Sequence, residues 1–232
     1  MSVEYAIQDT SAIRWAGGGL ALSGTIALVT SLLFGSAFGA VAASDPALGV
    51  TALEWAEHLR EDRVLRTWLW SVELAAQAIL AMTALVLIAE SRGGALWLPR
   101  QGAWAAIATG AVVQVVMIST MLGGYPAALD TVESSAALLE SLTGVVAVLA
   151  TISTGAILVG LMGVLIGETQ TAEFISRRVG WVGVGICATG TTLLVAGSAG
   201  VAPSLIAVPF ALLARALMIY LGVRLFRSEK SV

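Results

Sequence analysis

The stretch that decides the fold is residues 136–167, AALLESLTGVVAVLATISTGAILVGLMGVLIG, whose one ionisable residue, Glu140, lies near its beginning. An apolar run of more than about 18 residues is a candidate for a helix that crosses the ~30 Å hydrocarbon layer of a bilayer. In lipid, a helix satisfies every backbone N–H and C=O group within the segment itself. We therefore predict a transmembrane helix over Ala136–Gly167.

Five further apolar segments of spanning length flank this one, and they are Trp15–Ala42, Thr67–Ala89, Gly102–Gly124, Val179–Gly200 and Pro203–Leu225. The composition agrees, because the 232 residues are 58% hydrophobic and 12% charged, against ~45–50% and ~25% in soluble domains. We predict an all-α polytopic membrane protein. Residues 1–232 form a single domain, a bundle of six transmembrane helices with a short outer interfacial helix.

The residues between the first two spans predict that interfacial helix. Ala40-Val41-Ala42 resembles a signal-peptidase site, but the apolar run before it is longer than the 7–15-residue core of a signal peptide, so we expect the first span to be retained. Thr51-Ala52-Leu53-Glu54 is a capping box, and the charged and apolar residues after it predict an amphipathic helix over residues 51–66. It is either a lid or partner-docking platform, or a simple re-entry helix whose charges pair with one another.

The distribution of basic residues predicts the orientation. With six spans, eight residues share one side (Arg14, Arg92, Arg100, Arg177, Arg178, Arg224, Arg227 and Lys230), and three lie on the other (Arg60, Arg63 and Arg66). Aromatic residues are expected as interface anchors, with Trp15, Trp97, Trp104, Trp181 and Tyr220 at the first side and Trp68, Trp70 and Tyr125 at the second. By the positive-inside rule, we predict a multi-pass protein of a prokaryotic cell (inner) membrane with both termini in the cytoplasm.

Rare residue types exclude several classes of chemistry. The chain has one His (His58), one Cys (Cys187) and one Lys (Lys230). One chain therefore cannot supply two His ligands to a haem or a zinc ion, a thiolate metal cluster, or an intramembrane lysine for a Schiff base. Ser198 lies in a small-residue run, and no span holds a His that could act as its base. A net charge of −3 offers no basic surface for nucleic acid, and we expect no cofactor and no metal.

Five polar residues at membrane depth form a candidate buried polar site: Glu73, Gln77, Gln114, Glu140 and Arg215. Ionisable groups inside spans are costly and are candidates for functional sites. Two interpretations are open. Arg215 is either the counter-ion of a substrate or of a proton-carrying Glu73, or one half of a structural ion pair. Because an unpaired Arg at the midplane costs more, we predict that Arg215 pairs inside the bundle with Glu73, and that Gln77 completes the set.

Small residues predict close helix packing. Gly35 and Gly39, and Gly163 and Gly167, are spaced as GxxxG motifs, which let helix backbones approach each other. We expect these contacts within one chain rather than between copies. Pro209 is expected to kink the last span just outside Arg215.

The whole-chain layout resembles a family of uncharacterised six-span membrane proteins of bacteria and archaea, a domain-of-unknown-function group of about this length. A Gly-rich first span follows Arg14-Trp15-Ala16-Gly17, a polar outer segment leads into Leu65–Trp70, and Ser176-Arg177-Arg178-Val179-Gly180-Trp181 introduces the fifth span. Ala202-Pro203 re-enters the last span, which ends soon after Leu221-Gly222. The resemblance covers most of residues 12–226. It implies a compact bundle and carries no functional residues.

These observations favour a non-catalytic integral membrane protein. We expect an accessory subunit or a binding protein, whose partner in the bilayer is another membrane protein, a lipid or an apolar small molecule. One alternative is a small transporter or channel that uses an outward-facing Glu73/Arg215/Glu140 site. Another is a membrane-embedded enzyme with Glu73 or Glu140 as its general acid–base.

Overall fold

The computed structural model describes residues 10–38, 63–91, 97–130, 135–201 and 204–227. Six long helices account for almost all of them: α1 (Thr10–Phe38), α4 (Arg63–Glu90), α5 (Trp97–Asp130), α6 (Ser135–Thr171), α7 (Arg177–Ser198) and α8 (Val208–Phe226). A short 3₁₀ helix, η2 (Ser204–Ala207), precedes α8. All six are long and apolar enough to span a membrane, which confirms the prediction of an all-helical chain with six candidate spans.

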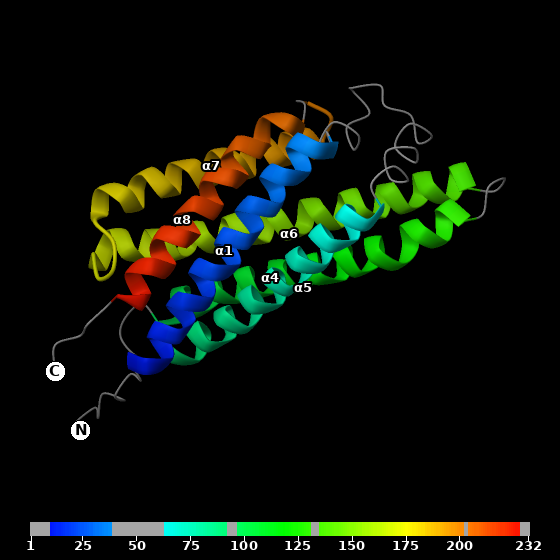
Figure 1. Ribbon diagram of the computed structural model, residues 1–232. Helices are drawn as coiled ribbons and strands as arrows, with labels where there is room; N and C mark the ends of the chain where they lie inside the picture. The colour runs from blue at the N-terminus through cyan, green and yellow to red at the C-terminus, as the bar shows by residue number, and fades with distance from the viewer. Residues whose placement is uncertain (1–9, 39–62, 92–96, 131–134, 202–203, 228–232) are drawn as a thin grey trace.

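The six helices run up and down in one bundle, and helices that are consecutive in the chain pack side by side (Figure 1). The bundle is closed by α1, which packs against α4 on one side and against α8 on the other. We call the end where α1 begins and α8 ends the terminal end, and the opposite end the far end. The Arg14 guanidinium lies over the Phe226 ring at the terminal end, 5.8 Å from its centroid, and so connects the first helix to the last.

The helix boundaries differ from those expected at three places. The interfacial helix expected over residues 51–66 lies outside the described residues up to residue 62, and residues 63–66 form the first turn of α4. Helix α5 continues through Pro126 to Asp130, beyond the expected end at Gly124. The kink expected at Pro209 is wrong, because Pro209 stands in the first turn of α8, where a residue without an N–H is tolerated.

A side-chain cap and two residues with positive φ mark the helix ends at the α6–α7 and α7–α8 turns. The Ser176 hydroxyl caps α7 by accepting a hydrogen bond from the Val179 amide, 3.5 Å away. Gly200 follows α7 with φ +70°, a left-handed conformation that glycine adopts at little cost. Ala172 follows α6 with φ +50°, which strains a residue that carries a Cβ.

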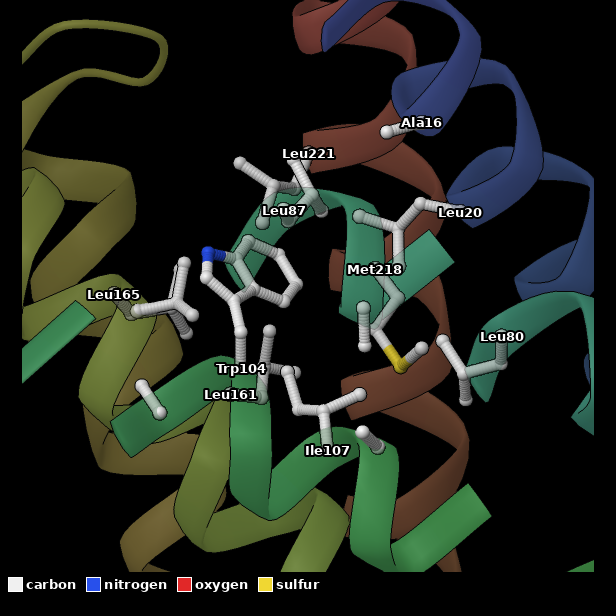
Figure 2. Close-up of a cluster of buried hydrophobic side chains, with 14 of the residues drawn as sticks. Ala16, Leu20, Leu80, Leu87, Trp104, Ile107, Leu161, Leu165, Met218 and Leu221 are labelled. Carbon is white, nitrogen blue, oxygen red and sulfur yellow. The ribbon is translucent and has the colours of Figure 1, made fainter. Parts of the chain in front are cut away.

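The main core fills the half of the bundle nearer the terminal end. Ten of its side chains point toward one another from α1, α4, α5, α6 and α8, with the Trp104 indole in their midst (Figure 2). A second cluster joins α4, α5 and α6 in the other half and includes Trp70 and Tyr125, whose rings stack 5.8 Å apart. The expectation that Trp70, Trp104 and Tyr125 are interface anchors is therefore wrong, because all three are buried. Sequence position predicted their depth along the helix but not the face on which they lie.

Glycines bring two helix pairs into backbone contact. A Cβ on Gly222 of α8 would lie 2.5 Å from the Ala21 amide nitrogen of α1, and one on Gly17 of α1 would lie 2.7 Å from the Gly222 carbonyl oxygen. In the same way, a Cβ on Gly160 of α6 would lie 2.6 Å from the Ala103 carbonyl oxygen of α5. Gly163, the first residue of a predicted GxxxG motif, also faces Ala103. The contacts of this motif lie within the chain, as expected.

Candidate functional site

An ion pair between two of the six candidate membrane-spanning helices forms the centre of the candidate site. Arg215 of α8 places Nη1 3.6 Å from Oε1 of Glu73 of α4. The Glu73 side chain is 8% exposed and that of Arg215 is 22% exposed. Both residues lie in the half of the bundle nearer the far end, since they belong to the first halves of α4 and α8. The structure thus confirms the predicted pairing of Arg215 with Glu73 inside the bundle.

Neutral groups complete the coordination of both charges. Gln77, one turn beyond Glu73 on α4, donates Nε2–H to Glu73 Oε1 at 2.7 Å, as predicted. The Thr30 hydroxyl of α1 donates to Glu73 Oε2. Arg215 Nη1 donates to the Ala27 carbonyl oxygen and to the Ser31 hydroxyl oxygen of α1, the latter at 2.6 Å. Three helices therefore meet at one buried carboxylate and one guanidinium.

The remaining members of the predicted set do not join this cluster. Gln114 of α5 is buried, as expected, and no hydrogen bond from it to Glu73 or Arg215 is found within the described part of the chain. Glu140 of α6 is exposed, so the expectation that it belongs to a buried site is wrong. It lies one residue after the buried Leu139, and the rotation of about 100° per residue about the helix axis turns its carboxylate away from the interior.

The three contributors from α1 were missed. Ala27, Thr30 and Ser31 lie on one face of α1, spaced three and four residues apart. A signal did exist in the sequence, because two adjacent hydroxyl residues interrupt the apolar run of α1. The backbone carbonyl of Ala27 leaves no such signal.

The arrangement is well suited to holding helices together. Both oxygens of Glu73 accept hydrogen bonds from protein groups, and one of them also faces Arg215. A carboxylate whose acceptor positions are occupied in this way is poorly placed to take a proton from a substrate. One acceptor in the cluster has no donor, the buried Oε1 of Gln77.

A second charged network lies at the terminal end. Glu168 of α6 is buried and accepts hydrogen bonds from the Phe174 and Ile175 amides at 2.9 and 3.3 Å. Arg100 of α5 places Nη2 3.7 Å from Glu168 and 3.2 Å from Glu173. These groups line a hollow together with apolar side chains, which include Trp104. The network ties the α6–α7 turn to α5, and sequence reasoning did not anticipate it.

A third charged residue is buried, and it has no ion-pair partner among the residues that the structure describes. Arg66 of α4 is 2% exposed, and its Nε and Nη1 atoms have no hydrogen-bond acceptor. The guanidinium carbon lies 5.1 Å from the centroid of the Trp70 ring. The sequence had indicated only that Arg66 is one of three basic residues of the outer loops.

An apolar groove runs between α1 and α4 on the outside of the bundle. It is lined by Ala12, Trp15, Ala16, Ala78, Ile79, Met82, Thr83 and Val86. Trp15 is 80% exposed at one end of it, and Met82 is 65% exposed along its side. Three of its eight lining residues are alanines. Neither this groove nor the hollow at the terminal end is lined by Glu73 or Arg215.

The described residues contain no group of three His, Cys, Asp or Glu side chains placed to hold a metal ion. Comparison of the chain with protein-family models, with curated proteins and with solved structures gives no match in any of the three. The layout resemblance to six-span membrane proteins of unknown function therefore stays a prediction.

Proposed function

We propose that this chain is a non-catalytic binding protein or accessory subunit of a cell membrane, and that it receives the apolar chain of a lipid or a similarly apolar small molecule in the α1/α4 groove. The observation that carries the proposal is the groove itself. It lies on two helices of spanning length, it is open to the outside, and Thr83 is its one polar lining residue. In a bilayer this surface faces acyl chains, and a concave apolar surface gains more contact with a chain than a convex one does.

The internal ion pair supports a scaffold role for the neighbouring helices. Glu73 of α4 is fixed to Thr30 of α1 and to Arg215 of α8, so the relative position of α1 and α4 is set by charged hydrogen bonds. A groove between two helices that are held in this way keeps its shape when it is empty. A rigid empty site loses less entropy when it binds a ligand.

The test compares two alanines that are both exposed on the outside of the bundle. Ala78 lies in the groove, and Ala105 lies on α5 outside it. We expect native mass spectrometry of the detergent-solubilised wild type to show a retained lipid or apolar molecule. Ala78→Trp should fill the groove and remove that mass, whereas Ala105→Trp should keep it. Equal retention by the two variants would contradict the proposal.

A small transporter that uses Glu73 and Arg215 is the second candidate. The observation in its favour is that Arg215 keeps 22% exposure and that Gln77 Oε1 lacks a donor, so the cluster has room for one more polar contact. A transporter would move a labelled solute or protons across proteoliposomes, and Glu73→Gln would abolish that flux while the protein remained folded. A binding protein shows no flux in either form.

We also propose an orientation, with the terminal end in the cytoplasm. Among the described residues, Arg14, Arg100, Arg177, Arg178, Arg224 and Arg227 lie toward the terminal end, and Arg63 and Arg66 lie at the far end. This asymmetry supports a cytoplasmic terminal end under the positive-inside rule.

A further inference from the structure

We infer that Arg66 forms an oxyanion-binding site at the far end of the bundle, between α4, α5 and α6, and that its ligand is a phosphate group. The site is separate from the α1/α4 groove, whose Trp15 end lies at the terminal end. It is also separate from the Glu73–Arg215 pair, which α1, α4 and α8 form together.

The first observation is a buried cation with donors to spare. Arg66 is 2% exposed, and two of its three nitrogens are buried without an acceptor. Among the described residues, no carboxylate lies within ion-pair distance of it. A buried charged donor that lacks an acceptor is strongly unfavourable, so we expect a bound ligand to supply the acceptor.

The second observation is a rigid aromatic wall on one side of the guanidinium. Arg66 lies on the face of Trp70, and Trp70 in turn stacks on Tyr125 of α5. A cation–π contact holds the plane of the guanidinium but accepts none of its in-plane hydrogen bonds. The N–H groups at the edge of the plane are therefore fixed in direction and left for an oxygen ligand.

The third observation is the depth of the site. The 28 residues of α4 begin at Arg63. At 1.5 Å per residue, Arg66 lies about 16 Å from the middle of the helix, close to the ~15 Å half-thickness of the hydrocarbon layer. Trp68, which is 68% exposed, marks the same level on the outer side of α4. Phosphate groups of lipids lie at this depth, and phosphate in water can reach it.

The chemistry of the ligand follows from that of the Arg66 guanidinium. A planar guanidinium with free N–H groups recognises oxygens of phosphate or carboxylate, and at the headgroup level phosphate is the abundant oxyanion. The phosphate comes either from a phospholipid headgroup or from free inorganic phosphate. The experiment separates these two sources.

The experiment measures the Tm of the full chain, purified in a neutral detergent with chloride as the only anion. One arm adds inorganic phosphate and the other adds phosphatidylglycerol, each at about 100 times its dissociation constant. We expect a rise in the Tm of the wild type of about 5 °C in at least one arm. A response to phosphatidylglycerol alone identifies the headgroup as the source, and a response to inorganic phosphate alone identifies the free ion.

Arg66→Gln should lose this response, because glutamine is neutral and offers fewer donors. Arg63→Gln is the matched control, since Arg63 lies one turn away and is exposed, and it should respond like the wild type. If Arg66→Gln does not fold, Arg66→Lys keeps the charge without the planar fork and should show a reduced rise. A wild type that responds to neither source overturns the inference, because the chain then supplies its own acceptor. An equal response in Arg66→Gln overturns it as well.

Discussion

Polar contacts from three helices meet at the side chain of Glu73. Its two oxygens receive Gln77 from its own helix, Thr30 from α1 and the charge of Arg215 from α8. Removal of either charge leaves the other buried beside partners arranged for an ion pair. The cost of such a stranded charge exceeds the net contribution of the pair itself.

A double replacement separates these two quantities. We expect Arg215→Ala to destabilise the bundle by about 3 kcal/mol, the lower end of the range for breaking a buried pair, because Arg215 keeps 22% exposure. Arg215→Leu combined with Glu73→Leu should recover most of that loss, since no charge is then left unpaired. Chemical unfolding in mixed micelles measures both values. A double variant as unstable as the sum of the two single variants would contradict the pairing.

Ala172 is a residue at which a substitution is expected to stabilise the protein rather than destabilise it. It adopts a left-handed conformation with φ +50° directly after α6, and this conformation costs a non-glycine residue about 1 kcal/mol. Ala172→Gly should therefore raise the free energy of unfolding by up to about 1 kcal/mol. The control is Ala75→Gly, at an exposed position inside α4, which should lower it by a similar amount. Thermal unfolding of the two variants should show shifts of opposite sign.

At the scale of the element, some helices pair through glycines and others pair through large side chains. The α1/α8 and α5/α6 pairs approach through glycines until backbone atoms touch, whereas α4 joins α5 through large side chains such as Trp70 and Tyr125. Backbone contact leaves no space into which an added side chain could move. The glycine pairs should therefore tolerate substitution poorly.

Gly222 and Gly185 provide a matched comparison for this expectation. A Cβ on Gly222 meets α1 backbone atoms at 2.5 and 2.7 Å, and a Cβ on Gly185 of α7 meets no atom within 4 Å. Gly222→Val should cost about 1–3 kcal/mol or more and separate α8 from α1. Gly185→Val should leave stability nearly unchanged. Loss of a crosslink between engineered cysteines on α1 and α8 would report the separation, and similar behaviour of the two variants would refute it.

The α6–α7 turn depends on one carboxylate from the end of α6. Glu168 accepts the amides of Phe174 and Ile175, and Arg224 of α8 donates to the Phe174 carbonyl oxygen at 2.9 Å. Hydrogen bonds to charged groups contribute about 1.5–3 kcal/mol. Glu168→Leu should therefore speed amide hydrogen exchange of Phe174 and Ile175 by about 10–100-fold. Glu168→Gln retains an acceptor oxygen and should show a smaller change. Unaltered exchange in Glu168→Leu would contradict the stabilisation of the turn by Glu168.

At the scale of the whole molecule, the six helices follow from the sequence because each apolar run reaches the ~18 residues of a candidate membrane span. The Glu73–Arg215 pair was predictable for a related reason: ionisable residues in such runs are few, so the possible partners are few. The hydroxyls of Thr30 and Ser31 were not, because serine and threonine in a helix commonly donate to their own backbone, as Thr25 and Thr151 do here. The second limit was that the sequence did not show which side of a helix faces the interior of the bundle. Trp104 and Glu140 were placed at the correct level along the chain but on the wrong side of their helices, and Arg66 was assigned to an outer loop although it is buried in α4.

The orientation is testable because the chain has one cysteine, Cys187, which is buried in the core. In a Cys187→Ser background, Ser176→Cys places a thiol in the exposed α6–α7 turn at the terminal end. Val201→Cys places one after α7 at the far end, at a position that is 80% exposed. A membrane-impermeant maleimide added to intact cells should label the residue at position 201 and spare the one at 176. The reverse pattern would place the terminal end outside the cell.

The closure of the bundle by its first and last helices has a consequence for its biogenesis. Each neighbouring pair from α4 to α7 can assemble as the ribosome releases it, because its partner has just been made. Helix α1 instead waits with Gly17, Ala27 and Ser31 uncovered until the 19 residues of α8 have left the ribosome. Translation that stops before α8 leaves a chain in which the face of α1 that packs on α8 is uncovered. A membrane protease that recognises such an uncovered face would therefore remove truncated chains and spare complete ones.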